Sequence, residues 1–297
     1  MSPPDTRLTA GSEGLVLGER FVATLSGEVG FPDQSPLFYK DKAEQADGRY
    51  RFMFDADCPF VRLTLGGETR PDGIESERAE LWEKRRVIVP YGAGAWYGIR
   101  VRCVEPIPRD TGRHLLMQWK GDIPFGNVPN VSPFLALRLS QGRLFMTADA
   151  MTLPESGEGA AVWQRAKSGQ SRVWLADDGR PPAARQKFDA RSDAIQVETF
   201  GTPLPKVENG WIDFVFYARP GPRGDGRLEV VANGNRIVSA RGRIGHEGLT
   251  PGAYFKFGPY RDAAVGEWSV DYADFRRGPR CLDVAGPKVA SLFSDLV

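Results

Sequence analysis

Short segments in which apolar and polar residues alternate run along most of the chain from about residue 20 to residue 278. Alternation with a period of two is typical of half-buried β-strands. No long helical period, heptad or internal repeat interrupts them, and 34 glycines and 23 prolines supply the turns between strands. The segments predicted as strands are 20–25, 50–54, 60–65, 77–82, 95–103, 114–120, 134–139, 143–146, 211–218, 227–238, 253–262 and 266–275.

This series of strands without intervening helices predicts an all-β fold, a jelly-roll sandwich of two antiparallel sheets. Asn233-Gly234 is the strongest hairpin signal. Residues 149–200 show no clear period and are interpreted as an insertion or a long rim loop. The predicted organisation is an N-terminal arm over 1–18, one domain over 19–278 and a C-terminal tail over 279–297.

The tail contains apolar residues at a spacing that suits a short helix. Such a helix would pack either on the body of the domain or on a partner. The second alternative implies a homo-oligomer or assembly into a particle through the tail. The apolar residues are Val284, Val289, Leu292, Phe293 and Leu296.

Three of the predicted strands have polar residues on one face and apolar residues on the other. If the apolar faces meet between the sheets, the polar faces line one concave surface that suits an acidic polymer. Ordinary solvated sheet faces alternate in the same way, so the pattern alone leaves both interpretations open. The polar faces carry Arg78 and Glu80, Gln118 and Lys120, and Tyr254, Lys256 and Tyr260.

The segment 253–262 has the most informative polar face. Gly258 lies between Lys256 and Tyr260 and leaves room for a group close to the backbone. A phenol beside cations is a candidate proton-transfer group, because positive neighbours favour the phenolate. His114 is four residues before Gln118, so alternation places it on the same face, near the edge of the predicted groove.

Charge and composition argue against several classes of binding partner. The net charge of +1 argues against nucleic acid and against a membrane surface, and no apolar run approaches the ~18 residues of a membrane span. Three cysteines and two histidines without a CxxC motif predict neither a disulfide framework nor a metal site. Calcium support of a loop stays open. The first residues show no secretory signal, and the localisation is left undecided.

The chain resembles jelly-roll polysaccharide lyases of the alginate lyase and glucuronan lyase type, which have a concanavalin-like β-jelly-roll fold. The resemblance rests on Arg78-Ala79-Glu80-Leu81, Gln118-Trp119-Lys120 and the segment from Tyr254 to Arg261. It implies β-elimination on an acidic polysaccharide that contains uronic acid. Tyr260 would be the catalytic acid and also a candidate base, with Arg78 and Gln118 neutralising the substrate carboxylate. Lys120 completes the expected catalytic set, and the expected substrate-binding residues are Lys256, Tyr254, Glu80, Arg138 and His114.

One residue departs from the family pattern. Lys120 stands where the family usually has a histidine, and an ammonium group is a poor base at neutral pH unless its pKa falls strongly. Two interpretations follow: Tyr260 serves as both base and acid, or catalysis is lost and the groove only binds a capsule-like glycan, as in a fibre or spike of a phage-like particle. A laminin-G-like protein-binding sandwich is a third, weaker interpretation.

Overall fold

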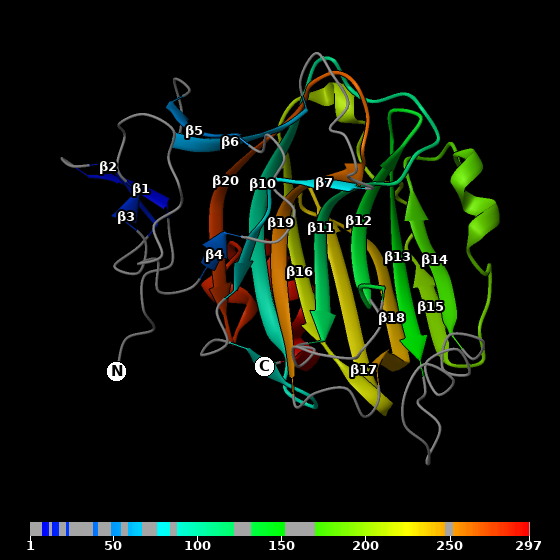
Figure 1. Ribbon diagram of the computed structural model, residues 1–297. Coiled ribbons are helices and arrows are strands. Elements are labelled where there is room, and N and C mark those ends of the chain that lie inside the picture. The colour runs from blue at the N-terminus through cyan, green and yellow to red at the C-terminus, as the bar shows by residue number, and fades with distance from the viewer. Residues whose placement is uncertain are drawn as a thin grey trace, which may run out of the picture.

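The computed structural model describes residues 59–66, 76–83, 88–121, 132–151, 170–246 and 252–296, together with the backbone of short strands before residue 55. Two antiparallel sheets face one another, and we call them the front sheet and the back sheet after their places in Figure 1. This arrangement confirms the predicted jelly-roll sandwich. None of the described helices is long and apolar enough to cross a membrane.

The front sheet is ordered around β19, with three short strands on one side of it and four long strands on the other. The short strands are β7 (Ser76–Arg78), β8 (Leu81–Glu83) and β9 (Val89–Pro90), and β4 (Phe38–Lys40) pairs with β8. The four long strands follow β19 (Gly252–Asp262) in the spatial order β11 (His114–Gly121), β12 (Leu135–Ser140), β13 (Arg143–Met151) and β14 (Ser171–Asp177).

Among the described residues the back sheet has eight strands, and the hairpin of its last two consecutive strands contains the predicted Asn233-Gly234 turn. Both turn residues have positive φ, which suits the twist of a two-residue hairpin. The strands in spatial order are β5 (Arg49–Phe54), β6 (Pro59–Leu65), β20 (Trp268–Gly278), β10 (Ala95–Val104), β16 (Ile212–Arg219), β17 (Gly221–Ala232), β18 (Asn235–His246) and β15 (Ile195–Thr199). The ends of β13 and β18 pair in parallel and join the two sheets.

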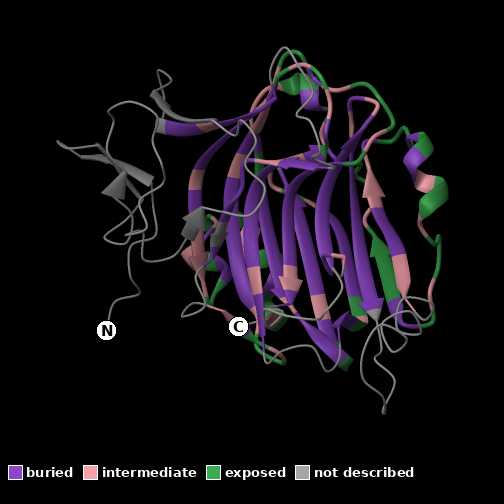
Figure 2. Ribbon diagram, viewed as in Figure 1, coloured by how far each residue is buried: buried purple, intermediate pink, exposed green. Residues whose placement is uncertain are grey.

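The core lies between the sheets, where the strands are buried along most of their length (Figure 2). Trp119 packs against Phe255 of the neighbouring strand and against Phe216 of the back sheet, with ring centroids 4.5 and 4.8 Å apart. Met117 and Phe257 belong to the same core. The apolar faces of the predicted motif strands therefore do meet between the sheets, as expected.

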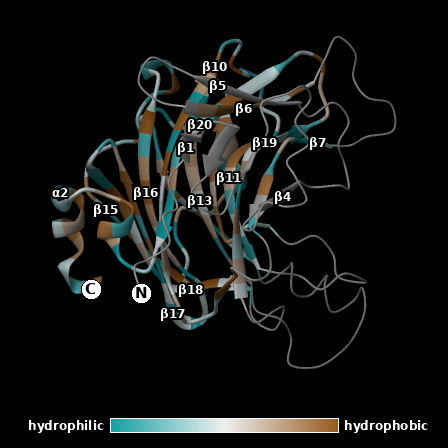
Figure 3. Ribbon diagram, turned by 90° about the vertical axis from the view of Figure 1, so that its left-hand side faces the viewer, coloured by the Kyte–Doolittle hydropathy of each residue, from teal (hydrophilic) through white to brown (hydrophobic). Residues whose placement is uncertain are grey.

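The C-terminal tail packs on the chain's own back sheet. Figure 3 shows α2 (Pro287–Ala290) outside the layer that contains β16. Phe293 packs against Trp96 at 4.9 Å, and Val284 is buried in the same cluster. Of the two predicted alternatives, packing on the body is the one seen; assembly through the tail stays a prediction. The remaining short helices are η3 (Ala183–Lys187), η4 (Val207–Asn209), η5 (Cys281–Asp283) and η6 (Ser291–Leu296).

One segment differs from the predictions. The region 149–200, interpreted as an insertion or a long rim loop, contributes β14 and β15, although residues 152–169 lie outside the described part. Of the strand predicted over 20–25, only β3 (Val22–Ala23) falls within the described residues, and it forms a small sheet with β2 (Gly14–Leu17) and β1 (Leu8–Gly11). The domain boundaries at residues 18 and 278 stay predictions.

Candidate active site

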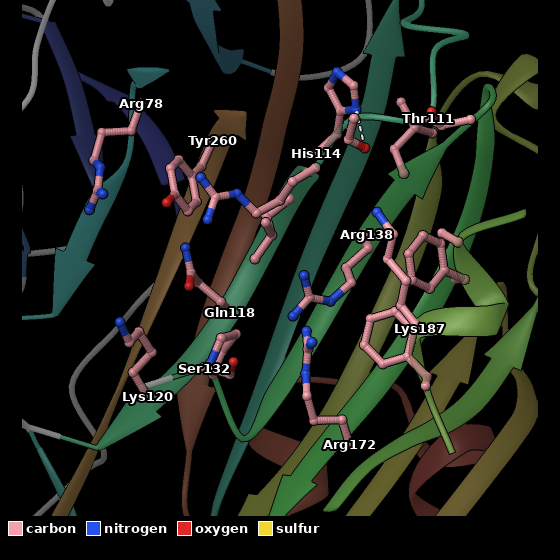
Figure 4. Close-up of a pocket in the computed structure, with 18 of the residues that line it drawn as sticks. Arg78, Thr111, His114, Gln118, Lys120, Ser132, Arg138, Arg172, Lys187 and Tyr260 are labelled. Atoms are coloured by element: carbon pink, nitrogen blue, oxygen red, sulfur yellow. Dashed lines mark hydrogen bonds between the residues drawn. The ribbon is translucent and has the colours of Figure 1, made fainter. Parts of the chain in front are cut away.

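A groove of about 380 Å³ lies on the outer face of the front sheet, bounded at one end by the segment that contains η3. Seven cationic side chains line it, and among its described lining residues there is no carboxylate. Figure 4 shows side chains from β7, β19, β11, β12 and β14 directed into this space. The seven cations are Arg78, Arg113, Lys120, Arg138, Arg172, Lys187 and Lys256.

Tyr260 stands at one end of the groove between two guanidinium groups. Arg78 is its cross-strand partner on β7, and the Arg78 Cζ atom lies 4.5 Å from the centre of the tyrosine ring. Arg113 Cζ lies 4.6 Å from the same centre. Guanidinium groups over an aromatic face are attracted to its electrons, and these two contacts hold the Tyr260 ring at the groove. The structure thus brings together Tyr260 and Arg78 as predicted, and it adds Arg113.

Gln118 and Lys256 are cross-strand neighbours that share one buried carboxylate. Gln118 Nε2 donates to Glu80 Oε1, and Lys256 Nζ donates to Glu80 Oε2 at 2.8 Å. Glu80 is 0% exposed and is not among the described lining residues, and its expected contact with substrate stays a prediction. Its function is to orient Gln118 and to neutralise Lys256 from beneath.

Glu80 is buried because the chain passes very close to β19 at this point. The strand predicted over 77–82 is interrupted at Ala79 and Glu80, between β7 and β8. Gly258 lies opposite with φ +131°, and a Cβ atom there would be 2.0 Å from the Ala79 carbonyl oxygen. The room that Gly258 was expected to leave is therefore occupied by the protein's own backbone.

His114 does not share the face of Gln118. A bulge between Leu115 and Met117 shifts the alternation, so that Leu115, not His114, lies opposite Tyr260. The His114 ring packs edge-on against Trp268 of the back sheet at 5.1 Å, at the rim of the groove. Burial lowers its pKa, and its Nδ1 atom lies 3.2 Å from the Gly112 carbonyl oxygen.

Lys120 and Tyr254 are cross-strand neighbours at the other end of the motif strands. Lys120 lines the groove, as predicted, and Figure 4 shows its side chain on the same side of β11 as Gln118. Tyr254 is half-buried and is not among the described lining residues. Its predicted contact with substrate stays a prediction.

Arg138 lines the groove two strands away from β19, and its expected contact with substrate stays a prediction. It donates to Thr147 Oγ1 at 2.9 Å. Burial and the nearby Arg172 lower its pKa to about 9, so it remains a cation at neutral pH. Sequence reasoning missed Arg113, Arg172 and Lys187. Only Arg172 had a signal, the short alternation of residues 171–177.

His246 is fully buried at the end of β18. Its Nε2 atom lies 3.1 Å from Asp149 Oδ1, where β13 and β18 join the two sheets. In the parts of the chain that can be described, no three His, Cys, Asp or Glu side chains gather to hold a metal ion. The absence of cofactors and the candidate structural calcium both stay predictions.

Comparisons with known proteins agree with this geometry. The family model for polysaccharide lyases matches residues 42–275. No curated protein matches the sequence. The chain is similar in structure to an endo-β-1,4-glucuronan lyase from the fungus Trichoderma reesei, with a TM-score of 0.57 and 12% identity, over 83% of this chain and 92% of that one.

Two alginate lyases are also similar in structure. Alginate lyase AlyC3 has a TM-score of 0.43 and 12% identity, over 76% of this chain and 77% of that one. Alginate lyase A1-II′ has a TM-score of 0.42 and 15% identity, over 76% of this chain and 82% of that one. Since the family model spans most of the chain and the sandwich carries a polar groove, the chain belongs to the polysaccharide lyase family and is an enzyme that cleaves polysaccharide.

Proposed function

We propose that this lyase cleaves an acidic, uronic-acid-containing polysaccharide by β-elimination. The observation that carries the proposal is the charge of the groove: seven cations line it, and its described lining contains no carboxylate. A neutral glycan has no group that would compensate these charges, whereas each uronate residue supplies one. The glucuronan lyase and the alginate lyases similar in structure support the same substrate class.

Elimination needs a base for the proton at C5, a cationic partner for the adjacent carboxylate and an acid for the leaving oxygen. The Tyr260 phenolate takes the C5 proton. The C5–H electrons form the C4–C5 double bond while the C4–O4 bond breaks, and the Tyr260 hydroxyl then gives the proton to O4. Tyr260 ends as it began, and no external reactant is required.

The substrate carboxylate is held by Arg78 and Gln118. The Arg78 guanidinium provides a planar fork that matches a carboxylate. One Gln118 N–H is fixed on Glu80, which leaves the other N–H of the amide for the substrate. Stabilising the negative charge that develops on this carboxylate is the largest contribution expected from the site.

Lys120 takes the position of the base in other family members but acts as a cation. An ammonium group near its usual pKa of 10.4 holds its proton at neutral pH and attracts a uronate. Tyr260 therefore remains the base, in a syn elimination in which one residue removes and returns the proton. The alternative of a non-catalytic capsule-binding protein, particle-borne or not, becomes one outcome of the assay.

The test is the ultraviolet absorbance of the unsaturated uronate product, with glucuronan, alginate and bacterial capsule as substrates. Tyr260→Phe removes the proton-transferring oxygen and should lower turnover by about 100-fold or more while binding is retained. Tyr217→Phe is the matched control, because Tyr217 packs on Trp96 of the back sheet, away from the groove. Full turnover in Tyr260→Phe contradicts the mechanism. Glycan binding without cleavage by the unaltered enzyme favours the binding protein.

A further inference from the structure

A second group of cations lies at the end of the groove opposite Tyr260. It consists of Arg138 on β12, Arg172 on β14 and Lys187 at the end of η3. Figure 4 shows the guanidinium groups of Arg138 and Arg172 turned toward one another. Like charges that converge in this way repel one another, and an anion between them removes the repulsion.

The charge of this group is incompletely balanced. Arg138 is 6% exposed, and among the described residues no carboxylate lies within ion-pair distance of it. Arg172 has Asp149 at 3.8 Å, but that carboxylate also accepts a hydrogen bond from Gln170 and contacts His246. A buried cation without a counter-ion is unfavourable, and a bound carboxylate would supply the missing partner.

Aromatic side chains pack against the guanidinium groups of this second group of cations. The Phe188 ring lies 5.5 Å from Arg138 Cζ and 4.7 Å from Arg172 Cζ. Phe188 itself packs against Phe145 and Trp174, each with ring centroids 5.9 Å away. These contacts fix the two guanidinium groups before a ligand arrives, so little conformational entropy is lost on binding.

The distance between this second group of cations and Tyr260 determines how long an acidic chain must be to contact both. The space between Arg138 and Arg172 lies over β13, which is three strands from β19 in the front sheet. At the usual spacing of strands this is about 14 Å. One sugar unit is about as long as the distance between neighbouring strands. A chain with one uronate at Tyr260 must therefore extend over several further sugar units to reach Arg172.

We propose that Arg138, Arg172 and Lys187 form a carboxylate-binding subsite for a uronate several sugar residues away from the bond that is cleaved. This inference rests on the proposed function of the groove. It assigns a task to the segment around η3 and predicts that the enzyme selects extended acidic chains over short ones.

The test measures binding of a uronate disaccharide and a uronate hexasaccharide by calorimetry, with the Tyr260→Phe protein to prevent cleavage. Lys187→Gln and Arg172→Gln should each raise the Kd of the hexasaccharide about tenfold and leave that of the disaccharide unchanged. Arg185→Gln is the matched control: it lies in the same short helix but contacts Trp174 and Asp177 instead of the groove.

Unchanged hexasaccharide affinity in both variants, or an equal loss for both ligands, overturns the subsite. Cleavage of the same hexasaccharide by the unaltered enzyme reports separately on the proposed function. Cleavage with unchanged affinities removes only the subsite, and length-dependent binding without cleavage removes only the elimination chemistry. If neither acidic ligand binds, both proposals fail.

Discussion

Gln118 and Lys256 depend on a single buried carboxylate, that of Glu80. Lys256 is 1% exposed and Glu80 is 0% exposed, so their contact is a salt bridge without access to water. Such a pair contributes little net stability compared with apolar residues of the same size, yet removing one partner leaves a buried charge uncompensated. Its value in this enzyme lies in the placement of an amide and an ammonium group on the groove.

Glu80→Gln should therefore lower the free energy of unfolding by about 3 kcal/mol, because the buried Lys256 ammonium loses its salt bridge to the Glu80 carboxylate. Urea unfolding at neutral pH measures the loss. The double variant Glu80→Gln/Lys256→Met removes the isolated charge and should recover most of the stability. A single variant that is as stable as the double variant would show that Glu80 does not neutralise Lys256.

His114 links stability to pH. Burial lowers its pKa in the folded protein, whereas the unfolded chain binds the proton near pH 6.5. The unfolded state thus holds more protons once the pH falls through about 6.5, and the contribution of His114 to stability is lost as the pH falls further. His114→Phe keeps an aromatic ring on Trp268, so its unfolding free energy should fall less steeply over this range. Equal slopes for both proteins would contradict the assignment.

For individual residues, the alternation of polar and apolar positions predicted one shared polar surface, and the structure confirms it as one groove. The residues concerned are Arg78, Gln118, Lys120, Lys256 and Tyr260. The alternation failed for Glu80 and His114. Both lie beside irregular backbone, either the interruption between β7 and β8 or the bulge in β11. A bulge changes the parity of a strand without leaving a mark in the hydrophobic pattern.

The element on which the groove depends is β19, which pairs with β11 on one side and with β7, β8 and β9 on the other. Its strong alternation made it predictable. The strands β14 and β15 were missed because each lies at the edge of its sheet and pairs with only one of the described strands. Four of the five residues of β15 are exposed, so little apolar pattern remains.

Gly258→Ala tests the close approach of β19 to Ala79. A methyl group would lie 2.0 Å from a carbonyl oxygen at a φ of +131°, so we expect a loss of about 3 kcal/mol in stability and reduced turnover as Arg78 is displaced. Gly234→Ala is the control, since its φ is +77° but no atom lies within 4 Å. The free energy of unfolding of Gly234→Ala should fall by only about 1 kcal/mol, because alanine is less favourable than glycine at a positive φ. Thermal unfolding of both variants separates backbone strain from steric contact, and equal losses would exclude the steric part.

Across the whole molecule, a net charge close to zero coexists with an uneven distribution of positive charge. The chain carries 39 basic and 38 acidic residues, yet its groove collects seven cations without a carboxylate among the described lining residues. Bulk composition argued against nucleic acid as a partner, which stays a prediction, and it could not locate this surface, because strands distant in sequence build it. On a protein with little net charge, the positive charge gathered in the groove attracts acidic chains to the groove itself.

This uneven distribution of charge predicts how salt acts on the enzyme. Raising the salt concentration from about 0.01 M to about 0.15 M shortens the screening length from about 30 Å to about 8 Å, so kcat/KM on a long acidic chain should fall several-fold. Lys120→Gln removes one groove cation and should reduce the slope of that fall. Lys288→Gln is the control, since Lys288 is an exposed cation on α2, outside the back sheet. If both variants change the slope equally, long-range attraction comes from the whole surface and the groove has no special part in it.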